Sequence, residues 1–282
     1  MSQKSYDGKP TLYLVPTPIG NLDDITIRAI NVLKESEVIF SEDTRETKKL
    51  LNYYEIDKKL IASHKYNENE SSKKVLDYLD KGFNVSIVSD RGTPGICDPG
   101  FEPAYQAINK GYNVVCLPGA TAFTPALVMS GLNPNKFLFY GFLDSKKSAK
   151  KKELETLKNE NYTIIVYESP YRVVETLKLI NEIMPGRKVS VAREISKKHE
   201  EVYRGLPNDI IDELGEPKGE FVVLIEENKE KETYEEIDIV SHVDKLISEG
   251  ESEKDAIKKV AKLHGLIKND VYIKYKEAKK WN

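Results

Sequence analysis

The chain has 282 residues, of which 39% are hydrophobic and 32% charged, enough for a buried core and for two domains with a small extra unit. Its formal net charge of only −3 excludes nucleic-acid binding through a basic field over the whole molecule. Any site for a polyanion must therefore be a local basic patch.

Neither secretion nor a membrane-spanning segment is predicted. The first ten residues are polar and lack the regions of a secretory signal, and no apolar stretch approaches the roughly 20 residues that cross a bilayer. Cys97 and Cys116 are isolated in the sequence, as is typical of buried thiols in a reducing compartment. We therefore expect a cytoplasmic protein with no membrane partner.

Up to about residue 130, strand patterns alternate with helical patterns. The predicted strands are Leu12–Val15, Val38–Ser41, Val85–Val88 and Val114–Leu117. The predicted helices are Asp24–Glu35, Asp43–Tyr53, Ser71–Lys81, Glu102–Lys110 and Ala122–Ser130. Strands separated by helices of this length indicate parallel βαβ units, so the fold class is α/β.

From Asn133 onwards the pattern changes. The predicted elements are strands at Phe137–Tyr140 (ending at Gly141), Thr163–Tyr167, Lys188–Ala192, Glu200–Arg204 and Phe221–Ile225, with helices at Lys150–Lys158 and Tyr171–Ile183. We expect the last two strands to be antiparallel partners. The predicted α/β domains are residues 1–125 and 126–228, with the boundary near Ala122–Asn133.

Residues 229–282 are predicted to form an acidic linker and a small helical unit. Seven carboxylates and two lysines lie between Glu226 and Asp238. Three helical patterns follow, at Ile239–Ser248, Glu253–Leu263 and Asn269–Lys280, with a spacing typical of a helix-turn-helix-sized bundle. The last two are rich in lysine, which fits either RNA binding or an ordinary solvated face.

Loops rich in Pro, Gly, Ser and Thr follow the predicted strands. The densest, Ser89–Gly100, holds three glycines and two prolines in twelve residues. Similar segments are Pro16–Asn21, Glu42–Arg45, Pro118–Thr121, Glu168–Arg172, Ala192–Glu194 and Lys218–Glu220. Each alone is typical of a tight turn. Because open α/β sheets bind ligands at the carboxyl ends of their strands, these loops together favour a backbone-lined cleft for an uncharged or zwitterionic cofactor.

Several common chemistries are absent from the sequence. No P-loop motif, no GxGxxG after the first strand and no GxSxG elbow occur. The four histidines, His64, His199, His242 and His264, lack Cys or carboxylate neighbours at the spacing of metal ligands, so no metal is expected.

Six segments resemble one family, in order and without a large gap, from about Leu12 to Glu226. They are Val15–Thr26, Glu42–Arg45, Ser89–Gly100, Tyr167–Arg172, Ala192–Lys197 and Lys218–Glu220. The family is the ribosomal RNA small subunit methyltransferase I branch of the tetrapyrrole methylase superfamily. The resemblance implies two unequal α/β domains, S-adenosylmethionine in the cleft between them, and usually a homodimer. It also implies methylation of the ribose 2′-oxygen of a cytidine in the decoding region of small-subunit (16S) ribosomal RNA.

The resemblance also implies which residues hold the cofactor. The matching positions are Pro18, Ile19, Gly20, Asp90, Gly92, Thr93, Ile96, Thr121, Ala122, Tyr167, Ala192, Gly219 and Glu220. One departure is Arg91, where the family usually has a small residue, commonly Ala. A cation there would either contact RNA phosphate or point to solvent.

Methyl transfer to a ribose hydroxyl needs alignment and either a base or a cation beside the developing alkoxide. The motif residues with suitable chemistry are Glu168, Arg45, Arg172, Asp43 and Arg193. Glu168 is the first choice for the base, and Arg45 or Arg172 for the electrostatic role. Each of these side chains could equally belong to a structural ion pair.

For RNA, five lysines stand within seven residues, at Lys146, Lys147, Lys150, Lys151 and Lys152. Such a cluster can follow phosphates, although it also fits the solvated start of a helix. The rival functions are a corrin or porphyrin methylase, a protein-modifying relative such as a diphthine synthase, and an RNA-binding protein that holds S-adenosylmethionine without catalysis.

Overall fold

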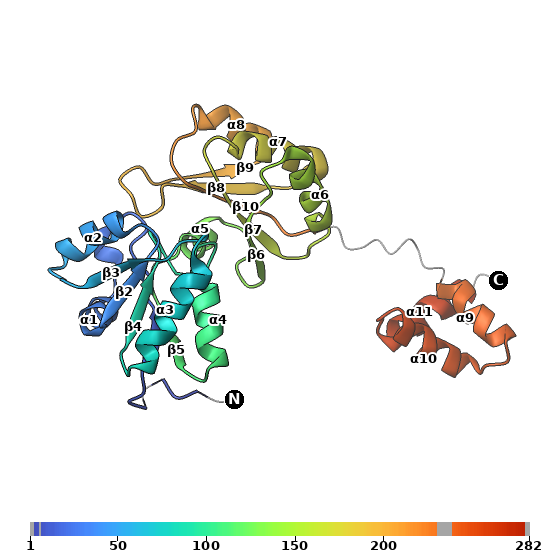
Figure 1. Cartoon of the computed structure of the whole chain (residues 1–282). Coiled ribbons are helices and arrows are strands. Elements are labelled where there is room, and N and C mark those ends of the chain that lie inside the picture. Colours follow the sequence, from blue (N-terminus) through green and yellow to red (C-terminus); the bar gives the residue numbers. More distant parts are fainter. Residues whose placement is uncertain (1–2, 6, 230–238, 280–282) are drawn as a thin grey trace. The chain divides into compact units, whose positions relative to one another are not determined.

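The computed structural model describes residues 3–5, 7–229 and 239–279. It divides into two compact units, Met1–Asn228 and Lys229–Asn282. Most of the predicted linker, residues 230–238, lies outside the described residues. The first unit contains two five-stranded sheets, here called the N-terminal sheet and the C-terminal sheet (Figure 1).

The N-terminal sheet is parallel and has helices on both faces. Its strands are β1 (Thr11–Leu14), β2 (Val38–Ser41), β3 (Lys59–Ala62), β4 (Val85–Val88) and β5 (Asn113–Cys116), in the order β3-β2-β4-β1-β5. On one face α1 (Ile27–Glu35) and α2 (Thr44–Tyr53) bury residues such as Leu33 and Leu51. On the other face α3 (Glu68–Asp80) and α4 (Phe101–Asn109) cover a second core around Phe40. This arrangement confirms the predicted βαβ units.

Two local features of this part differ from the prediction. The strand β3 was not predicted, because it is a partly exposed edge strand that begins with Lys59 and has no buried residue. The first helix was predicted to begin at Asp24. Instead, Leu22–Asp24 form a 3-10 turn (η1), and Thr26 caps α1 by accepting a hydrogen bond from the Ala29 N–H.

The C-terminal sheet is mixed. Its strands are β6 (Phe137–Phe142), β7 (Thr163–Glu168), β8 (Val189–Arg193), β9 (Glu201–Gly205) and β10 (Phe221–Ile225), in the order β6-β7-β10-β8-β9. Only the β6–β7 pair is parallel. The helices α6 (Lys147–Leu157), α7 (Val173–Ile183) and α8 (Pro207–Leu214) cover one face, and α5 (Phe123–Met129) packs on the other. The predicted division between residues 125 and 126 falls inside α5.

The predicted pairing of the last two strands was wrong. The strand β10 lies between β7 and β8, and β9 pairs with β8 instead. All five residues of β10 are buried, so it occupies a central position, whereas β9 has no buried residue and forms an edge. The strand β6 also continues through Gly141, with a register irregularity between Phe139 and Gly141.

The second unit is a three-helix bundle, as its sequence pattern predicted. Its helices are α9 (Ile239–Ser248), α10 (Glu253–Leu263) and α11 (Lys268–Lys279). Val243, Ile257, Val260 and Val271 lie in its core, and the buried Tyr275 hydroxyl donates to Asp244 Oδ1 over 2.7 Å. Within the described part of the chain, no helix has the length and apolar character needed to cross a membrane.

Candidate active site

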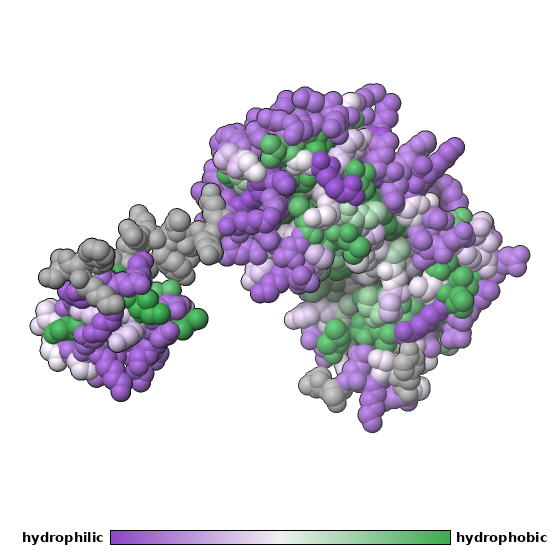
Figure 2. All heavy atoms as spheres, turned by 180° about the vertical axis from the view of Figure 1, so that it is seen from behind, coloured by the Kyte–Doolittle hydropathy of each residue, from purple (hydrophilic) through white to green (hydrophobic). Residues whose placement is uncertain are grey.

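A pocket of about 310 Å³ lies where loops of the N-terminal sheet face the C-terminal sheet. Its lining residues are Ile19, Arg91, Gly92, Thr93, Ile96, Cys97, Asp98, Thr121, Ala122, Phe142, Tyr167, Glu168, Ser169, Pro170, Ile195, Glu220, Phe221 and Val222. The strands β4, β1 and β5 are parallel neighbours, so the loops that follow them meet at one edge. Figure 2 shows hydrophobic residues gathered around a recess in the first unit.

Backbone contacts tie these loops together. The Thr17 N–H donates to Gly92 O over 2.9 Å and the Gly92 N–H donates back to Thr17 O over 3.1 Å. Gly92 has a φ of +80°, and a Cβ built there would lie 3.5 Å from Ile19 Cγ2. The Thr93 hydroxyl donates to Ala120 O over 3.4 Å. Glycine at position 92 thus keeps backbone at the pocket surface, where a side chain would narrow the space.

Aromatic rings form the wall on the side of the C-terminal sheet. The Tyr167 ring lies 5.6 Å from the Phe142 ring and 5.1 Å from the Phe139 ring, in both cases edge to face. Burial raises the pKa of the Tyr167 phenol to about 12, so it stays neutral at physiological pH. This wall suits the flat, largely apolar surface of an aromatic ring system in a ligand.

Glu168 lines the pocket, but its carboxylate is held by a buried network. Its Oε1 accepts from the Ser169 N–H over 2.9 Å and lies 2.7 Å from Arg172 Nε. Its Oε2 accepts from the Thr176 hydroxyl over 2.7 Å and lies 3.5 Å from Lys150 Nζ. Arg172 also donates to Leu143 O over 2.8 Å. This geometry favours the structural ion pair, which the sequence left open, over a free base at Glu168.

The other predicted catalytic side chains lie outside the pocket lining. Arg45 pairs with Asp43 at the surface, 2.7 Å apart, and this guanidinium holds the pKa of Asp43 well below its usual range. Asp43 also caps α2 by accepting from the Arg45 N–H. Arg193 pairs with Glu201 of the neighbouring strand over 2.9 Å. The contacts of Asp43, Arg45 and Arg193 are therefore those of structural ion pairs and a helix cap.

Asp98 is a pocket carboxylate that the sequence did not single out. No hydrogen bond or ion pair to it occurs among the described residues. Burial, followed by repulsion from Glu42, Asp90 and Glu220, raises the pKa of Asp98 to about 7. Its position in the Gly/Pro-rich loop Ser89–Gly100 could have marked Asp98 as a candidate site residue. The sequence alone could not show that its side chain lines the pocket.

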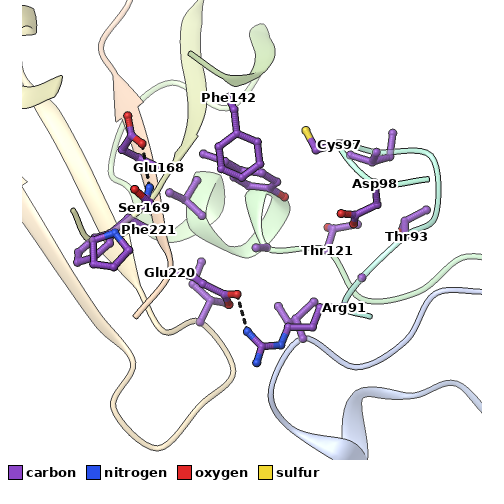
Figure 3. A pocket seen from close by; sticks show the side chains of 18 residues that line it. Arg91, Thr93, Cys97, Asp98, Thr121, Phe142, Glu168, Ser169, Glu220 and Phe221 are labelled. Carbon is purple, nitrogen blue, oxygen red and sulfur yellow. Dashed lines mark hydrogen bonds and ion pairs between the residues drawn. The ribbon is translucent and has the colours of Figure 1, made fainter. Parts of the chain in front are cut away.

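Arg91 spans the pocket edge. Its guanidinium pairs with Glu220, which precedes β10, as Figure 3 shows. Lys197 Nζ lies 3.0 Å from the other oxygen of Glu220 and 2.8 Å from Glu194. Arg91 therefore has a partner that neither of the two sequence-based alternatives included, namely a carboxylate of the C-terminal sheet.

The structure brings eight of the predicted cofactor residues to the pocket lining. These are Ile19, Gly92, Thr93, Ile96, Thr121, Ala122, Tyr167 and Glu220. The lining does not include Pro18, Gly20, Asp90, Ala192 or Gly219. Gly20 and Gly219 instead make room for side chains, since a Cβ on either would lie 2.3 Å from an atom of Lys197 or Glu194. Asp90 accepts a hydrogen bond from the Asp43 N–H over 3.0 Å, and Ala192 lies in the core beneath α5.

The lysine cluster divides into three groups. Lys146, Lys147 and Lys152 are exposed. Lys151 pairs with Glu182 over 2.6 Å. Lys150 is fully buried and lies 3.5 Å from both Glu168 and Glu175, so its assignment to RNA binding was wrong. The helical period turns this one position of the cluster towards α7, which a count of charges could not show.

No group of three or more His, Cys, Asp or Glu side chains that could hold a metal ion occurs within residues 3–5, 7–229 and 239–279. The pocket instead offers backbone groups, apolar and aromatic side chains, and carboxylates.

Comparison with known proteins gives three results. Residues 11–210 match the family model of the Tetrapyrrole (Corrin/Porphyrin) Methylases. The chain is 44% identical to the ribosomal RNA small subunit methyltransferase I of Bacillus subtilis, with 97% of each chain covered. It is 43% identical to the protein of the same name from Halalkalibacterium halodurans, with 96% of this chain and 97% of the relative covered.

Solved structures resemble the chain at lower identity. The methyltransferase CobJ has a TM-score of 0.59 and 19% identity, over 78% of this chain and 95% of its own. The cobalt precorrin-4 methyltransferase CbiF has a TM-score of 0.56 and 17% identity, over 80% and 98%. At such identities these structures establish the fold, not the substrate.

Proposed function

This chain belongs to the tetrapyrrole methylase family, in its ribosomal RNA small subunit methyltransferase I branch, and from that premise we propose its reaction and substrates. It is an rRNA methyltransferase. We propose that it transfers a methyl group from S-adenosylmethionine to the 2′-oxygen of a cytidine ribose in the decoding region of small-subunit rRNA.

The observation that carries this proposal is the 44% identity over 97% of both chains to a relative whose name specifies small-subunit rRNA. Solved uroporphyrin-III and cobalt precorrin-4 methyltransferases share the fold, at identities of 17–18%. The tetrapyrrole alternative therefore rests on the fold and on the family model, and neither of these determines the substrate.

The pocket residues fit S-adenosylmethionine as the methyl donor. Ile19, Ile96 and the Phe142–Tyr167 wall offer apolar and aromatic surface to an adenosine. Gly92 presents backbone at the pocket surface, where a Cβ would stand against Ile19. When bound, the donor supplies the methyl group on a positively charged sulfur.

The RNA substrate is proposed to lie along the start of α6. Lys146, Lys147 and Lys152 are exposed, and the first of them follows the pocket residue Phe142 by four positions. Lysines so placed would bind phosphates next to the nucleotide whose ribose enters the pocket, without reading the base sequence. Because ribosomal subunits are cytoplasmic in bacteria, the proposal includes a cytoplasmic location.

A homodimer is also part of the proposal. The helix α4 exposes Phe101, Tyr105 and Ile108, whose spacing places them on one helix face, and the first two rings stack at 5.9 Å. An exposed apolar stripe of this kind supports self-association. Sedimentation equilibrium should give twice the monomer mass, and Tyr105→Glu should shift it towards the monomer.

A transfer assay tests the reaction. Small ribosomal subunits from bacteria that lack this activity are incubated with the protein and methyl-labelled S-adenosylmethionine, and the labelled position is mapped by nuclease digestion. A 2′-O-methyl group blocks alkaline cleavage of the adjacent phosphodiester, so the label should remain in an alkali-resistant dinucleotide that contains cytidine. Label on a free corrinoid, and none on RNA, would support the tetrapyrrole alternative instead.

A further inference from the structure

We propose that Asp98 is the catalytic residue that accepts the proton of the ribose 2′-hydroxyl during methyl transfer. This inference rests on the proposed function, because it requires a hydroxyl acceptor in this pocket. A ribose hydroxyl is scarcely ionised at neutral pH, so a positioned base in the transition state contributes typically 10²–10⁴-fold to such a reaction.

The pocket lining contains three acidic residues, Asp98, Glu168 and Glu220, of which Glu168 has a fully buried side chain. The oxygens of Glu168 are held by Ser169, Thr176 and the cations beneath the pocket wall. Those of Glu220 are paired with Arg91 and Lys197 at the pocket edge. Of the three, only Asp98 has no hydrogen-bond or ion-pair partner in the described part of the chain. Its oxygens are therefore the ones that no cation or donor of the pocket competes for when a substrate hydroxyl approaches.

The loop holds Asp98 in a fixed place. Cys97, directly before it, has a φ of +64°, a left-handed conformation that non-glycine residues adopt rarely. Behind Asp98, the Gly95 N–H donates to Pro99 O over 3.1 Å, and the Gly100 N–H donates to the Glu68 carboxylate over 2.8 Å. In Figure 3 the Asp98 carboxylate extends from this loop towards the interior of the pocket, whereas that of Glu168 lies on the far side. A strained turn that is anchored in this way is typical of a functional position.

The surroundings of Asp98 match a base that works near neutral pH. Burial, and after it repulsion from the carboxylates of Glu42, Asp90 and Glu220, raises the pKa of Asp98 to about 7. The lining cation Arg91 is paired with Glu220. Cys97 and Cys116 are both exposed residues, so the expectation that they are buried thiols was wrong. Partial burial of the Cys97 thiol still raises its pKa, and burial raises that of the Tyr167 phenol, so both groups are uncharged at pH 7. A base is most effective when its pKa lies near the working pH.

The proposed step is balanced within the pocket. The ribose oxygen forms a bond to the methyl carbon of S-adenosylmethionine while the carbon–sulfur bond breaks and its electron pair remains on sulfur. The hydroxyl proton moves to the Asp98 carboxylate and leaves to solvent after release of the methylated RNA. The step changes no oxidation state, so it needs no oxidant or reductant.

The test compares Asp98→Asn with Asp57→Asn, in which an exposed carboxylate outside the pocket lining is changed in the same way. Methyl transfer to small subunits is measured as single-turnover rates between pH 5.5 and 9. For the unaltered protein we expect the rate to rise about tenfold per pH unit below pH 7 and to level off above it. Asp98→Asn should lower the plateau about 10²–10⁴-fold and remove this rise, whereas Asp57→Asn should do neither.

Binding measurements separate a base from other roles. Calorimetric titration of Asp98→Asn with S-adenosylmethionine and with S-adenosylhomocysteine should give affinities within about threefold of the unaltered protein, which also establishes that the variant is folded. If Asp98 instead held the positive sulfur, the variant would bind S-adenosylmethionine much more weakly and S-adenosylhomocysteine normally. That result, or a variant rate within tenfold of the original, would overturn the inference.

The same assay distinguishes failure of this inference from failure of the proposed function. If the unaltered protein transfers no methyl group to rRNA, the function proposed above is wrong, and the role of Asp98 is lost with it. If the unaltered protein is active and Asp98→Asn is equally active with the same pH profile, only the role of Asp98 is wrong.

Discussion

Beneath the pocket wall, Lys150, Glu168 and Arg172 form one charged cluster, in which the side chains of Lys150 and Glu168 are fully inaccessible to water. The cluster reaches the pocket through Ser169, whose N–H donates to Glu168. The cluster therefore holds the segment that lines the pocket after β7.

Replacing Lys150 with Ala should destabilise the protein strongly. The variant leaves Glu168 buried beside Arg172 without its ammonium neighbour, and breaking a buried pair in this way reduces the free energy of unfolding by about 3–5 kcal/mol. Denaturant unfolding measures the change. The control is Lys152→Ala, two positions along the same helix and exposed, which should stay within about 0.5 kcal/mol. Equal effects for the two variants would show that the buried network is energetically unimportant.

The pKa of Asp98 also predicts how stability depends on pH. The group has its ordinary pKa near 3.8 in the unfolded chain and about 7 in the folded protein. Between these values the unfolded chain has released a proton that the folded protein keeps, so ionisation of Asp98 lowers the free energy of unfolding as pH rises from about 4 to 7. Asp98→Asn has no such loss and should gain in melting temperature relative to the unaltered protein between pH 5 and pH 8. An equal difference at both pH values would contradict this prediction.

At the scale of elements, the start of α6 carries a buried lysine on one side and exposed lysines on the other. Lys150 faces α7 and the core, whereas Lys146, Lys147 and Lys152 face solvent. The exposed side is the part available to RNA. This division follows from the helical period, because neighbouring positions point about 100° apart.

Changing Lys146, Lys147 and Lys152 together to Ala should weaken binding to small subunits. Each lost phosphate contact reduces the dependence of log affinity on log salt concentration by about one unit, so the slope should fall by up to about three. Filter binding over a series of salt concentrations measures both quantities. The matched control replaces the exposed Lys73, Lys74 and Lys81 at α3. Equal losses in the two triple variants would argue against a phosphate site at α6.

At the scale of the whole molecule, the two units have separate hydrophobic cores. The pocket is built entirely from residues of the first unit, and the bundle of α9, α10 and α11 is closed around its own apolar residues.

A protein truncated after Asn228 should therefore remain folded and bind S-adenosylmethionine. We expect its affinity in calorimetric titration to stay within about threefold of the full chain, because no pocket residue is removed. Binding to small subunits is measured in parallel and reports any contribution of the helical unit. Loss of cofactor binding in a truncated protein that still unfolds cooperatively would show that the second unit supports the pocket.

Much of this architecture followed from the sequence. Strand and helix periodicities predicted most elements to within three residues, and the alternation of the two predicted the parallel sheet. The Gly/Pro-rich loops predicted where a pocket would lie, because parallel strands bring their carboxyl ends to one edge. These are local signals, since each depends on residues that are close together in the chain.

Tertiary structure decided the strand order of the C-terminal sheet and the pairing of the charged side chains, because both depend on which residues distant in the chain are buried together. The order of β10 and β9 followed from which strand could be covered on both faces. In the sequence Lys150 does not differ from the other four lysines of the cluster, and only the packing shows that it is buried against Glu168. The contact with Lys150 engages Glu168, the carboxylate that the sequence favoured as the base, whereas Asp98 has no partner among the described residues. The pKa of Asp98 is raised only in the folded chain, because burial and the field of three other carboxylates arise on folding. The sequence by itself determined the family, the fold and the loops of the site, whereas the folded arrangement decided which charges of the pocket are paired and that Asp98 is not.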